Sequence, residues 1–263
     1  MVIEHKELGK SGVRVSEIGL GTWQYRGGVE PLKEGIKLGA TLVDTAEIYG
    51  TEPIVGKALG EVGREKVFLA TKVSGQHLRY KDVLKAANAS LERLNVETID
   101  LYQVHWPNHA VPIEDTMRAM GELVDQGKVR FIGISNFSVE ETRQAQRYLS
   151  KAQVASNQVE YSLSERSIEQ DLLPYCIEEG ITIVAYSPLA RGHSLGGKSK
   201  VLDGIASKYK KTRSQVILNW ITSHENVIAI PKSDSVDHTR ENCGASGWRL
   251  SKEDIRAISE EVS

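Results

Sequence analysis

Features that mark several protein classes are scarce or missing in this chain. Only 2 of its 263 residues are cysteine, and these, Cys176 and Cys243, lie far apart in separate helical segments. We therefore expect no disulfide and no cysteine metal site, and we expect both side chains in the core. No apolar run approaches the roughly 20 residues that span a bilayer. The formal net charge of -2 leaves no dense basic face for a nucleic acid.

Several recognisable sequence motifs are also missing. No serine stands in the G-x-S-x-G of a hydrolase. Gly19 and Gly21 lack the third glycine of G-x-G-x-x-G and a helix directly behind it, so a doubly wound Rossmann sheet is a weak alternative. The segment 1–12 lacks the apolar core of a signal peptide, and we expect a cytoplasmic protein. No metal is expected, since five histidines without metal-ligand spacing are assigned to loops or the surface: His5, His77, His109, His193 and His224.

Eight apolar, β-branched runs alternate with helical patterns, at intervals of roughly 25–45 residues. The runs are residues 18–23, 41–46, 67–73, 99–106, 129–136, 154–161, 181–187 and 227–232. Their continuous apolar character is typical of a parallel sheet covered by helices. The sequence therefore predicts a single domain over residues 1–263, an α/β fold of the (β/α)8 TIM barrel type. A short β-hairpin around residues 10–12 is expected to close the bottom of the barrel.

The segments between these runs carry helix signals. Val83, Ala87 and Leu91 fall on one face at helical spacing. Ser138 and Glu141 have the spacing of a capping box that begins a helix, and a glycine at 180 is expected to end another.

Four polar residues stand where three successive runs end: Asp44, Tyr49, Lys72 and His105. The carboxyl ends of adjacent strands meet at one end of a βα barrel, where such folds carry their chemistry. Taken singly, these residues have ordinary interpretations as a helix cap, a turn residue, a solvated lysine and a core imidazole. Together they predict a proton relay that supports hydride transfer to a carbonyl group.

Each of the four has a role in this chemistry. Tyr49 is expected to give a proton to the carbonyl oxygen. Because the ordinary pKa of tyrosine is about 10, we expect the Lys72 ammonium to lower it. Asp44 would hold and neutralise Lys72, and His105 would orient the carbonyl by donating a hydrogen bond.

Four segments resemble motifs of the aldo-keto reductase family: VDTAEIYGTEPIVGKAL (43–59), TKV (71–73), LYQVHWP (101–107) and IPKS (230–233). The resemblance extends from residue 7 to residue 262. It implies an oxidoreductase that reduces aldehydes and some ketones to alcohols by hydride transfer from NAD(P)H. Tyr49 would be the general acid, tuned by Lys72 and Asp44, with His105 positioning the substrate. The family binds its cofactor extended across the barrel mouth, without a Rossmann turn.

The resemblance also implies a set of binding residues. Trp23 and Trp106 would flank the substrate, beside Tyr49 and His105. Without the resemblance, these tryptophans and the strand-end polar residues could equally serve packing or bind backbone and water. The implied cofactor-binding residues are Gly21, Thr22, Trp23, Asp44, Ser135, Asn136, Gln158, Tyr186, Ser187, Leu189, Arg191, Lys232, Ser233, Ser235, His238, Glu241 and Asn242. Among these, the amide and hydroxyl groups at 135, 136 and 158 would hold the nicotinamide carboxamide, and the ring at 186 would stack on the nicotinamide.

The segment after the last strand bears on the choice between NADPH and NADH. Lys232 matches the family position that meets the adenosine 2′-phosphate. The arginine usual six residues later is His238 here, which grips a phosphate more weakly because it is mostly neutral at pH 7. Arg240 is expected on a different side of the helix. We expect NADPH/NADP to be favoured and NADH also to be used.

The chain ends soon after residue 251, and its loops 107–112 and 190–198 are short. We therefore expect a form of the family with an abbreviated C-terminal tail and short substrate loops, and an open substrate site that accepts many carbonyl compounds. Aldehydes should be reduced faster than hindered ketones. The expected partner is a small carbonyl compound, without nucleic acid or membrane, and the expected state is a monomer or weak oligomer. Two alternatives stay open: a cofactor-binding regulatory subunit, and an isomerase or aldolase in which Lys72 forms a Schiff base.

Overall fold

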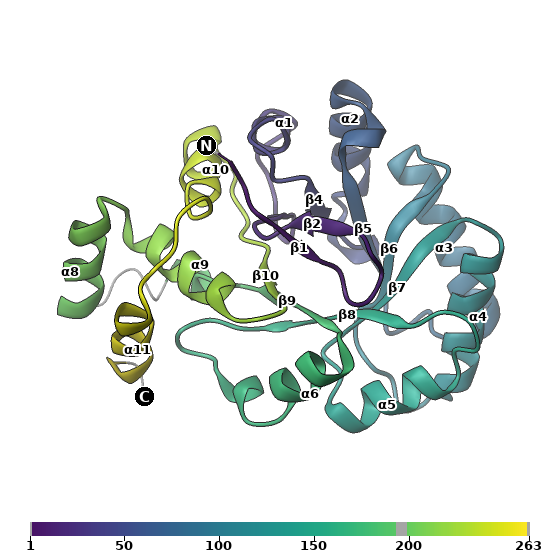
Figure 1. Cartoon of the computed structure of the whole chain (residues 1–263). Coiled ribbons are helices and arrows are strands. Elements are labelled where there is room, and N and C mark those ends of the chain that lie inside the picture. Colours follow the sequence, from purple (N-terminus) through teal and green to yellow (C-terminus); the bar gives the residue numbers. More distant parts are fainter. Residues whose placement is uncertain (1, 193–198, 262–263) are drawn as a thin grey trace.

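The computed structural model describes residues 2–192 and 199–261. Its main sheet is parallel, and each strand pairs with the strands before and after it along the chain (Figure 1). The strands are β3(Leu20–Gly21), β4(Leu42–Asp44), β5(Phe68–Val73), β6(Ile99–Val104), β7(Val129–Ser135), β8(Val154–Glu160), β9(Thr182–Tyr186) and β10(Val227–Ala229). All eight fall within the predicted runs.

Backbone hydrogen bonds between the first and last strands close this sheet into a barrel. Gly19 N donates to Ala229 O at 2.8 Å, and Ala229 N donates to Glu17 O at 2.9 Å. Gly21 N donates to Pro231 O at 3.1 Å, which continues the pairing to the carboxyl end of the strands. The predicted (β/α)8 barrel is thereby confirmed, and the Rossmann alternative is wrong.

Helices surround the strands on the outside of the barrel (Figure 1). They are α1(Glu30–Lys37), α2(Glu52–Val62), α3(Tyr80–Leu94), α4(Ile113–Asp125), α5(Val139–Arg147), α6(Leu172–Glu179), α8(Lys200–Tyr209), α9(Arg213–Ser223), α10(Val236–Cys243) and α11(Lys252–Glu261), with short 3-10 helices η1(Glu47–Tyr49), η2(Arg64–Lys66), η3(Ser167–Glu169) and η4(Ala190–Gly192). Helices α8 and α11 pack against each other at the periphery.

The predicted helix signals act as expected. Val83, Ala87 and Leu91 are buried on the inner face of α3. Ser138 accepts from the backbone N–H of Glu141, and the Glu141 side chain accepts from the backbone N–H of Ser138, which completes the capping box of α5. Gly180 ends α6 with a φ of 65°, a left-handed conformation that favours glycine.

A hairpin of β1(His5–Glu7) and β2(Arg14–Ser16) crosses the amino-terminal end of the barrel, drawn in purple in Figure 1. The turn side chain of Leu8 and the β2 side chain of Val15 are buried. They belong to the same apolar cluster as the inward-facing strand residues Leu42, Phe68, Ala70, Leu101, Ala155, Val184, Ile228 and Ile230. The hairpin therefore plugs the bottom of the barrel, as predicted.

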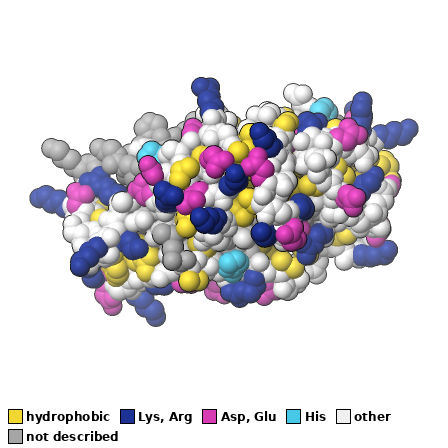
Figure 2. All heavy atoms as spheres, turned by 90° about the horizontal axis from the view of Figure 1, so that it is seen from above, with side chains coloured by type: hydrophobic (Ala, Val, Ile, Leu, Met, Phe, Trp, Pro, Cys, Tyr) yellow, Lys and Arg dark blue, Asp and Glu magenta, His cyan; other side chains and the backbone are white. Residues whose placement is uncertain are grey.

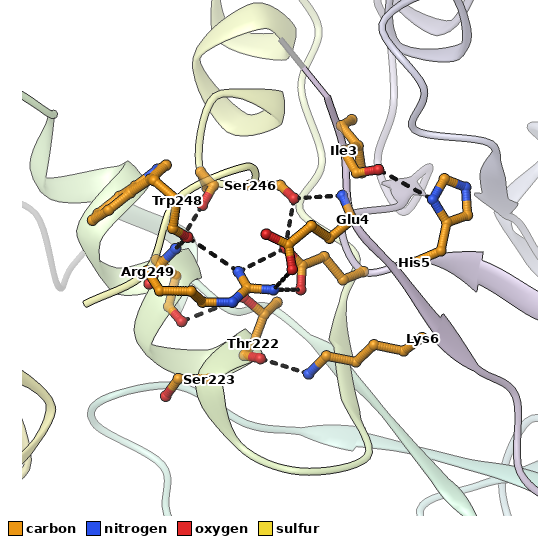
Figure 3. A network of polar contacts seen from close by, with 12 residues as sticks. Ile3, Glu4, His5, Lys6, Thr222, Ser223, Ser246, Trp248 and Arg249 are labelled. Carbon is orange, nitrogen blue, oxygen red and sulfur yellow. Dashed lines mark hydrogen bonds and ion pairs between the residues drawn. The ribbon is translucent and has the colours of Figure 1, made fainter. Parts of the chain in front are cut away.

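A polar network joins the amino-terminal segment to the last barrel units (Figure 3). Arg249 binds the fully buried Glu17 at 2.7 Å and also binds Glu4. Glu4 N donates to Ser246 Oγ at 2.8 Å. Lys6 Nζ donates to three backbone carbonyl groups of residues 222–227, and burial lowers the pKa of this ammonium to about 8. These contacts hold the hairpin in place against α9 and the 244–250 segment.

Both cysteines are buried and free, as expected. In the described ranges no helix is long and apolar enough to cross a bilayer, and no group of side chains could hold a metal ion. Acidic and basic side chains are interspersed over the face in Figure 2. Two histidines differ from expectation. His5 lies in β1 and is half-buried. His224 is half-buried and binds Trp220 O at 3.0 Å and Tyr161 Oη at 3.1 Å. His193 lies outside the described residues.

Shortening Leu8 to alanine tests the plug. The Leu8→Ala variant leaves a void in the barrel interior, and we expect it to lower the free energy of unfolding by about 3 kcal/mol. Urea unfolding followed by circular dichroism measures this loss. Val2 is 76% exposed, so Val2→Ala is the matched control and should change little. Equal stability of the two variants would contradict the plug.

Candidate active site

A cavity of about 680 Å³ opens at the carboxyl end of the strands. Its walls come from the carboxyl end of β8 and from the ends of β3, β4, β6, β7, β9 and β10 with the segments that follow them, so residues far apart in the sequence meet there. Asp44, Tyr49 and His105 line it. Lys72 is fully buried and contacts Asp44, so the structure brings the four predicted polar residues together.

Asp44 and Lys72 form a buried ion pair on adjacent strands. Lys72 Nζ donates to Asp44 Oδ1 at 2.5 Å and to Thr45 O at 2.8 Å. Asp44 is 2% exposed and Lys72 0%. Burial lowers the pKa of Lys72, and the Asp44 carboxylate acts in the opposite direction. Because each charge compensates the other, neither is stable at this depth alone.

A cluster of buried hydroxyl groups holds the turn that carries Tyr49. Thr51 Oγ1 lies 3.0 Å from Thr22 Oγ1 and 2.8 Å from Thr45 Oγ1. Gly50 ends η1 with a φ of 69°, a left-handed conformation that suits glycine. The cluster ties η1 to β3 and β4, and so fixes where the phenol can lie.

The surroundings of Tyr49 correct one expectation. Its hydroxyl lies 3.3 Å from His105 Nε2, and Lys72 Nζ lies 4.9 Å from its ring centre. We expected Lys72 to lower the pKa of Tyr49; instead burial raises the pKa of Tyr49, and Asp44 raises it further. The physical reason is that the Lys72 ammonium is already paired with Asp44, so the phenol faces a pair with no net charge. The phenol is therefore protonated at neutral pH.

His105 is neutral in this setting. Burial, reinforced by the nearby Lys72 ammonium, lowers the pKa of His105 to about 3. Nδ1 is buried and has no hydrogen-bond partner among residues 2–192 and 199–261, while Nε2 faces the Tyr49 hydroxyl. A neutral imidazole can carry a proton on Nε2 and donate it in a hydrogen bond to an oxygen in the cavity.

A chain of amide and hydroxyl groups lines the opposite wall. Tyr186 Oη donates to Asn136 Oδ1 at 3.0 Å, and Asn136 Nδ2 donates to Ser135 Oγ at 3.0 Å and to His105 O at 3.2 Å. Ser135 Oγ donates to Gln158 O at 2.8 Å. Asn136 has a φ of 63°, a left-handed conformation that asparagine tolerates. The chain links β7, β8 and β9 at the cavity.

The other predicted site residues divide into three groups. Those on the wall of the same cavity are Gly21, Thr22, Trp23, Trp106, Ser187, Leu189 and Lys232. Ser233 and Asn242 instead line a small pocket that shares Gly21 and Pro231 with the main cavity. Neither wall includes Ser235, which caps α10, the exposed His238, or the half-buried Glu241. The side chain of Arg191 lies outside the described part.

Charges around Lys232 bear on phosphate binding. Lys232 Nζ forms an ion pair with Asp234, whose Oδ1 accepts from Arg26 N at 2.8 Å. The Arg240 guanidinium is engaged with Glu34 of α1 at 2.8 Å. A ligand phosphate at Lys232 therefore meets a cation that Asp234 already partly neutralises.

Sequence reasoning missed several cavity residues. Gln24 lies in a turn and Ile48 in the three-residue helix η1, and neither is long enough for periodicity to assign a direction to a side chain. Glu160 and Pro188 were also not foreseen. Glu160 stands two residues after Gln158 on the same strand, so strand alternation could have placed both on one face.

The chain was compared with known proteins. The aldo/keto reductase family model matches residues 17–262. The chain belongs to the aldo-keto reductase family, and it is an oxidoreductase. It is 37% identical to methylglyoxal reductase YeaE of Escherichia coli over 97% of this chain and 94% of that protein. It is 38% identical to glyoxal reductase of Bacillus subtilis over 94% of this chain and 89% of that protein.

Solved structures of other aldo-keto reductases share this fold. A thermostable aldo-keto reductase solved with the inhibitor epalrestat has a TM-score of 0.92 and 39% identity, covering 99% of this chain and 100% of that one. An aldo-keto reductase of Klebsiella pneumoniae in complex with NADPH has a TM-score of 0.91 and 34% identity, covering 100% of this chain and 96% of that one.

The lowered pKa of His105 predicts a pH dependence of stability. An unfolded histidine titrates near pH 6.5, whereas folded His105 titrates near pH 3. Between these values the unfolded state binds more protons, so stability falls as the pH falls. We expect His105→Gln to lose less stability than the wild type between pH 7 and pH 5, measured by urea unfolding at both values. Equal losses in the two proteins would contradict this.

Proposed function

We propose that this chain reduces aldehydes, and some ketones, to alcohols by hydride transfer from NADPH, with Tyr49 as the general acid. The observation that carries the proposal is the meeting of Tyr49 and His105, 3.3 Å apart, above a buried Asp44–Lys72 pair at the wall of one cavity. The NADPH complex of the related Klebsiella enzyme and the names of the bacterial relatives support it.

The residues of the cavity fit a nicotinamide dinucleotide. Near the phenol the wall carries uncharged donors and acceptors at Asn136 and Gln158, suited to a carboxamide. Farther along it carries Lys232, suited to a phosphate. At Gly21 a Cβ atom would lie 2.6 Å from Ile230 O, so glycine is what lets the first and last strands approach this closely at the cavity wall. When bound, NADPH supplies the hydride.

The chain's own residues then manage the proton. Neutral His105 can donate through Nε2 to the substrate oxygen, and Tyr49 holds its proton until that oxygen gains negative charge. The Lys72 ammonium, 4.9 Å from the phenol ring, offsets only part of the cost of the phenolate left after proton transfer, because Asp44 compensates its charge. Asp44 keeps this ammonium in place. The high pKa of the free phenol therefore suits an acid that releases its proton only as charge develops.

The proposed binding roles follow the sequence expectations. We propose that Ser135, Asn136 and Gln158 hold the nicotinamide carboxamide, that Tyr186 stacks on its ring, and that Asp44 also contacts the cofactor. Roles at the pyrophosphate, phosphate and adenine are proposed for Gly21, Thr22, Trp23, Ser187, Leu189, Arg191, Lys232, Ser233, Ser235, His238, Glu241 and Asn242.

Small aldehydes are the proposed substrates, with 2-oxoaldehydes and dialdehydes first among them. The cavity mouth carries exposed apolar side chains at Trp23, Ile48 and Trp106, which are 39%, 60% and 50% exposed. These can contact an uncharged substrate without enclosing it, which supports broad acceptance. The relatives named as reductases of methylglyoxal and glyoxal support the small size.

We also propose that residues 1–263 form one domain that acts in the cytoplasm as a monomer or weak oligomer, without a nucleic-acid partner. The net charge of -2 and the mixed surface charges support the absence of a nucleic-acid partner.

Removing the phenolic hydroxyl tests the proposed acid. Tyr49→Phe should lower kcat for NADPH-dependent aldehyde reduction by about 10²- to 10⁴-fold, because it deletes the proton donor. NADPH oxidation at 340 nm with methylglyoxal and benzaldehyde measures this. Tyr148→Phe is the matched control, since Tyr148 is 45% exposed at the end of α5 and should leave the rate unchanged.

The same assay separates the alternatives. Tight NADPH binding without turnover in the wild type would favour a regulatory subunit. Trapping of the substrate on Lys72 by borohydride would favour a Schiff-base enzyme. Full activity of Tyr49→Phe would refute the assignment of the acid.

Replacing His238 tests cofactor choice. His238→Arg places a permanent planar cation beside the proposed phosphate position, and we expect the ratio of NADH to NADPH dissociation constants to rise about tenfold. Isothermal titration calorimetry measures both constants. Arg240→Gln is the control, because Arg240 is engaged with Glu34 and should leave the ratio unchanged. An unchanged ratio in His238→Arg would place the phosphate elsewhere.

A further inference from the structure

A buried glutamine lies beneath the proposed catalytic residues and has no part in the mechanism above. Gln103 is on β6, two residues before His105, so both side chains point to the same side of the strand. It is 0% exposed and lies deeper in the barrel than the cavity wall, which it does not line. An uncharged amide at this depth needs partners for both its donor and its acceptor.

Both ends of this amide are used, and both partners belong to the site. Gln103 Nε2 donates to Asp44 Oδ2 at 3.2 Å. Gln103 Oε1 accepts from Gln158 Nε2 at 3.4 Å. Gln158 Nε2 also donates to Asp44 Oδ2, at 2.8 Å. The three side chains therefore form a closed triangle that joins β4, β6 and β8 across the barrel interior.

The chemistry of the carboxylate fixes the orientation of both amides. An ionised aspartate can only accept hydrogen bonds, so Gln103 and Gln158 must each present an NH₂ group to Asp44. The second proton of the Gln158 NH₂ group then goes to Gln103 Oε1. This leaves Gln158 Oε1 as the atom that can accept from a ligand in the cavity, whose wall includes Gln158.

A glycine on the next strand makes room for this arrangement. Gly133 of β7 pairs in register with Gln103 on one side and Ser156 on the other. A Cβ atom at residue 133 would lie 2.7 Å from Gln103 Cγ and 2.7 Å from Ser156 Oγ, closer than real Cβ contacts allow. The Gln103 side chain therefore has room for its position only because residue 133 is glycine.

We propose that Gln103 is a positioning residue that orients Gln158 toward the nicotinamide carboxamide and holds Asp44 against Lys72. By accepting a second hydrogen bond from the Gln158 NH₂ group, Gln103 reinforces the orientation that Asp44 sets, so that Gln158 Oε1 faces the carboxamide NH₂ of the cofactor. The inference rests on the proposed function, because it assigns Gln103 a role toward that cofactor.

Binding of NADP⁺ and of adenosine 2′,5′-bisphosphate tests the positioning role of Gln103, because the two ligands share the phosphate end and only NADP⁺ carries the nicotinamide. Gln103→Met keeps the length of the side chain and removes both hydrogen-bonding atoms. We expect its dissociation constant for NADP⁺ to rise about tenfold, while that for adenosine 2′,5′-bisphosphate changes less than twofold, because the bisphosphate has no carboxamide. Isothermal titration calorimetry measures both constants without turnover.

Two further variants keep the test decisive. Gly133→Ala keeps the Gln103 side chain but displaces it, and this variant should show the same selective loss of NADP⁺ affinity. If Gln103→Met does not fold, the result for Gly133→Ala decides whether Gln103 positions Gln158. Ser156→Ala is the control, because Ser156 pairs in register with Gly133 and its hydroxyl has no partner among the described residues. The affinities of this variant for NADP⁺ and for the bisphosphate should stay at wild-type values.

The outcomes separate this inference from the proposed function. Wild-type NADP⁺ affinity in Gln103→Met, or an equal loss for both ligands, would overturn the positioning role, since a general distortion weakens both alike. The proposed function fails on a different observation, namely a wild-type protein that binds NADP⁺ but does not reduce aldehydes. Selective loss of NADP⁺ affinity in an active enzyme supports both.

Discussion

An ammonium and a carboxylate with almost no exposed surface meet 2.5 Å apart inside this barrel, and removing either would leave the other charged and buried at a cost of roughly 3–5 kcal/mol. The remaining donors and acceptors around the pair follow from that constraint. Lys72 finds a second acceptor in a backbone carbonyl group, and Asp44 finds further donors in Gln103 and Gln158. The phenol and the imidazole lie above this pair, and both are uncharged in the free protein chiefly because they are buried.

The barrel determines where such a pair can exist. Its interior divides into an apolar layer at the amino-terminal end, sealed by the hairpin, and a polar layer at the carboxyl end, open to the cavity. The apolar layer stabilises the fold through burial. The polar layer can be buried because its side chains form hydrogen bonds and an ion pair with one another. Closure between Gly19 and Ala229 brings the first and last loops together, so one cavity reaches from Tyr49 to Lys232.

Much of this could be predicted from the sequence, and the misses share a physical cause. The apolar runs that form strands, and the residues at which they end, are local properties of the sequence. They therefore predicted the barrel and the meeting of the four polar residues at its carboxyl end. They did not predict the direction of the Tyr49 pKa shift, because it depends on which partner the Lys72 ammonium takes. The half-buried position of His224 depends likewise on packing against Tyr161, which lies in a different part of the chain.

The sequence by itself determined the alternation of strands and helices, the polar residues at the strand ends, and the family to which they belong. Only the tertiary structure decided that Arg240 is engaged with Glu34 and that Gln103 joins Asp44 to Gln158. The reason is distance along the chain. Periodicity assigns a residue to a face, but the partner of a charge or an amide is set by which strands and loops the closed barrel brings within hydrogen-bonding reach.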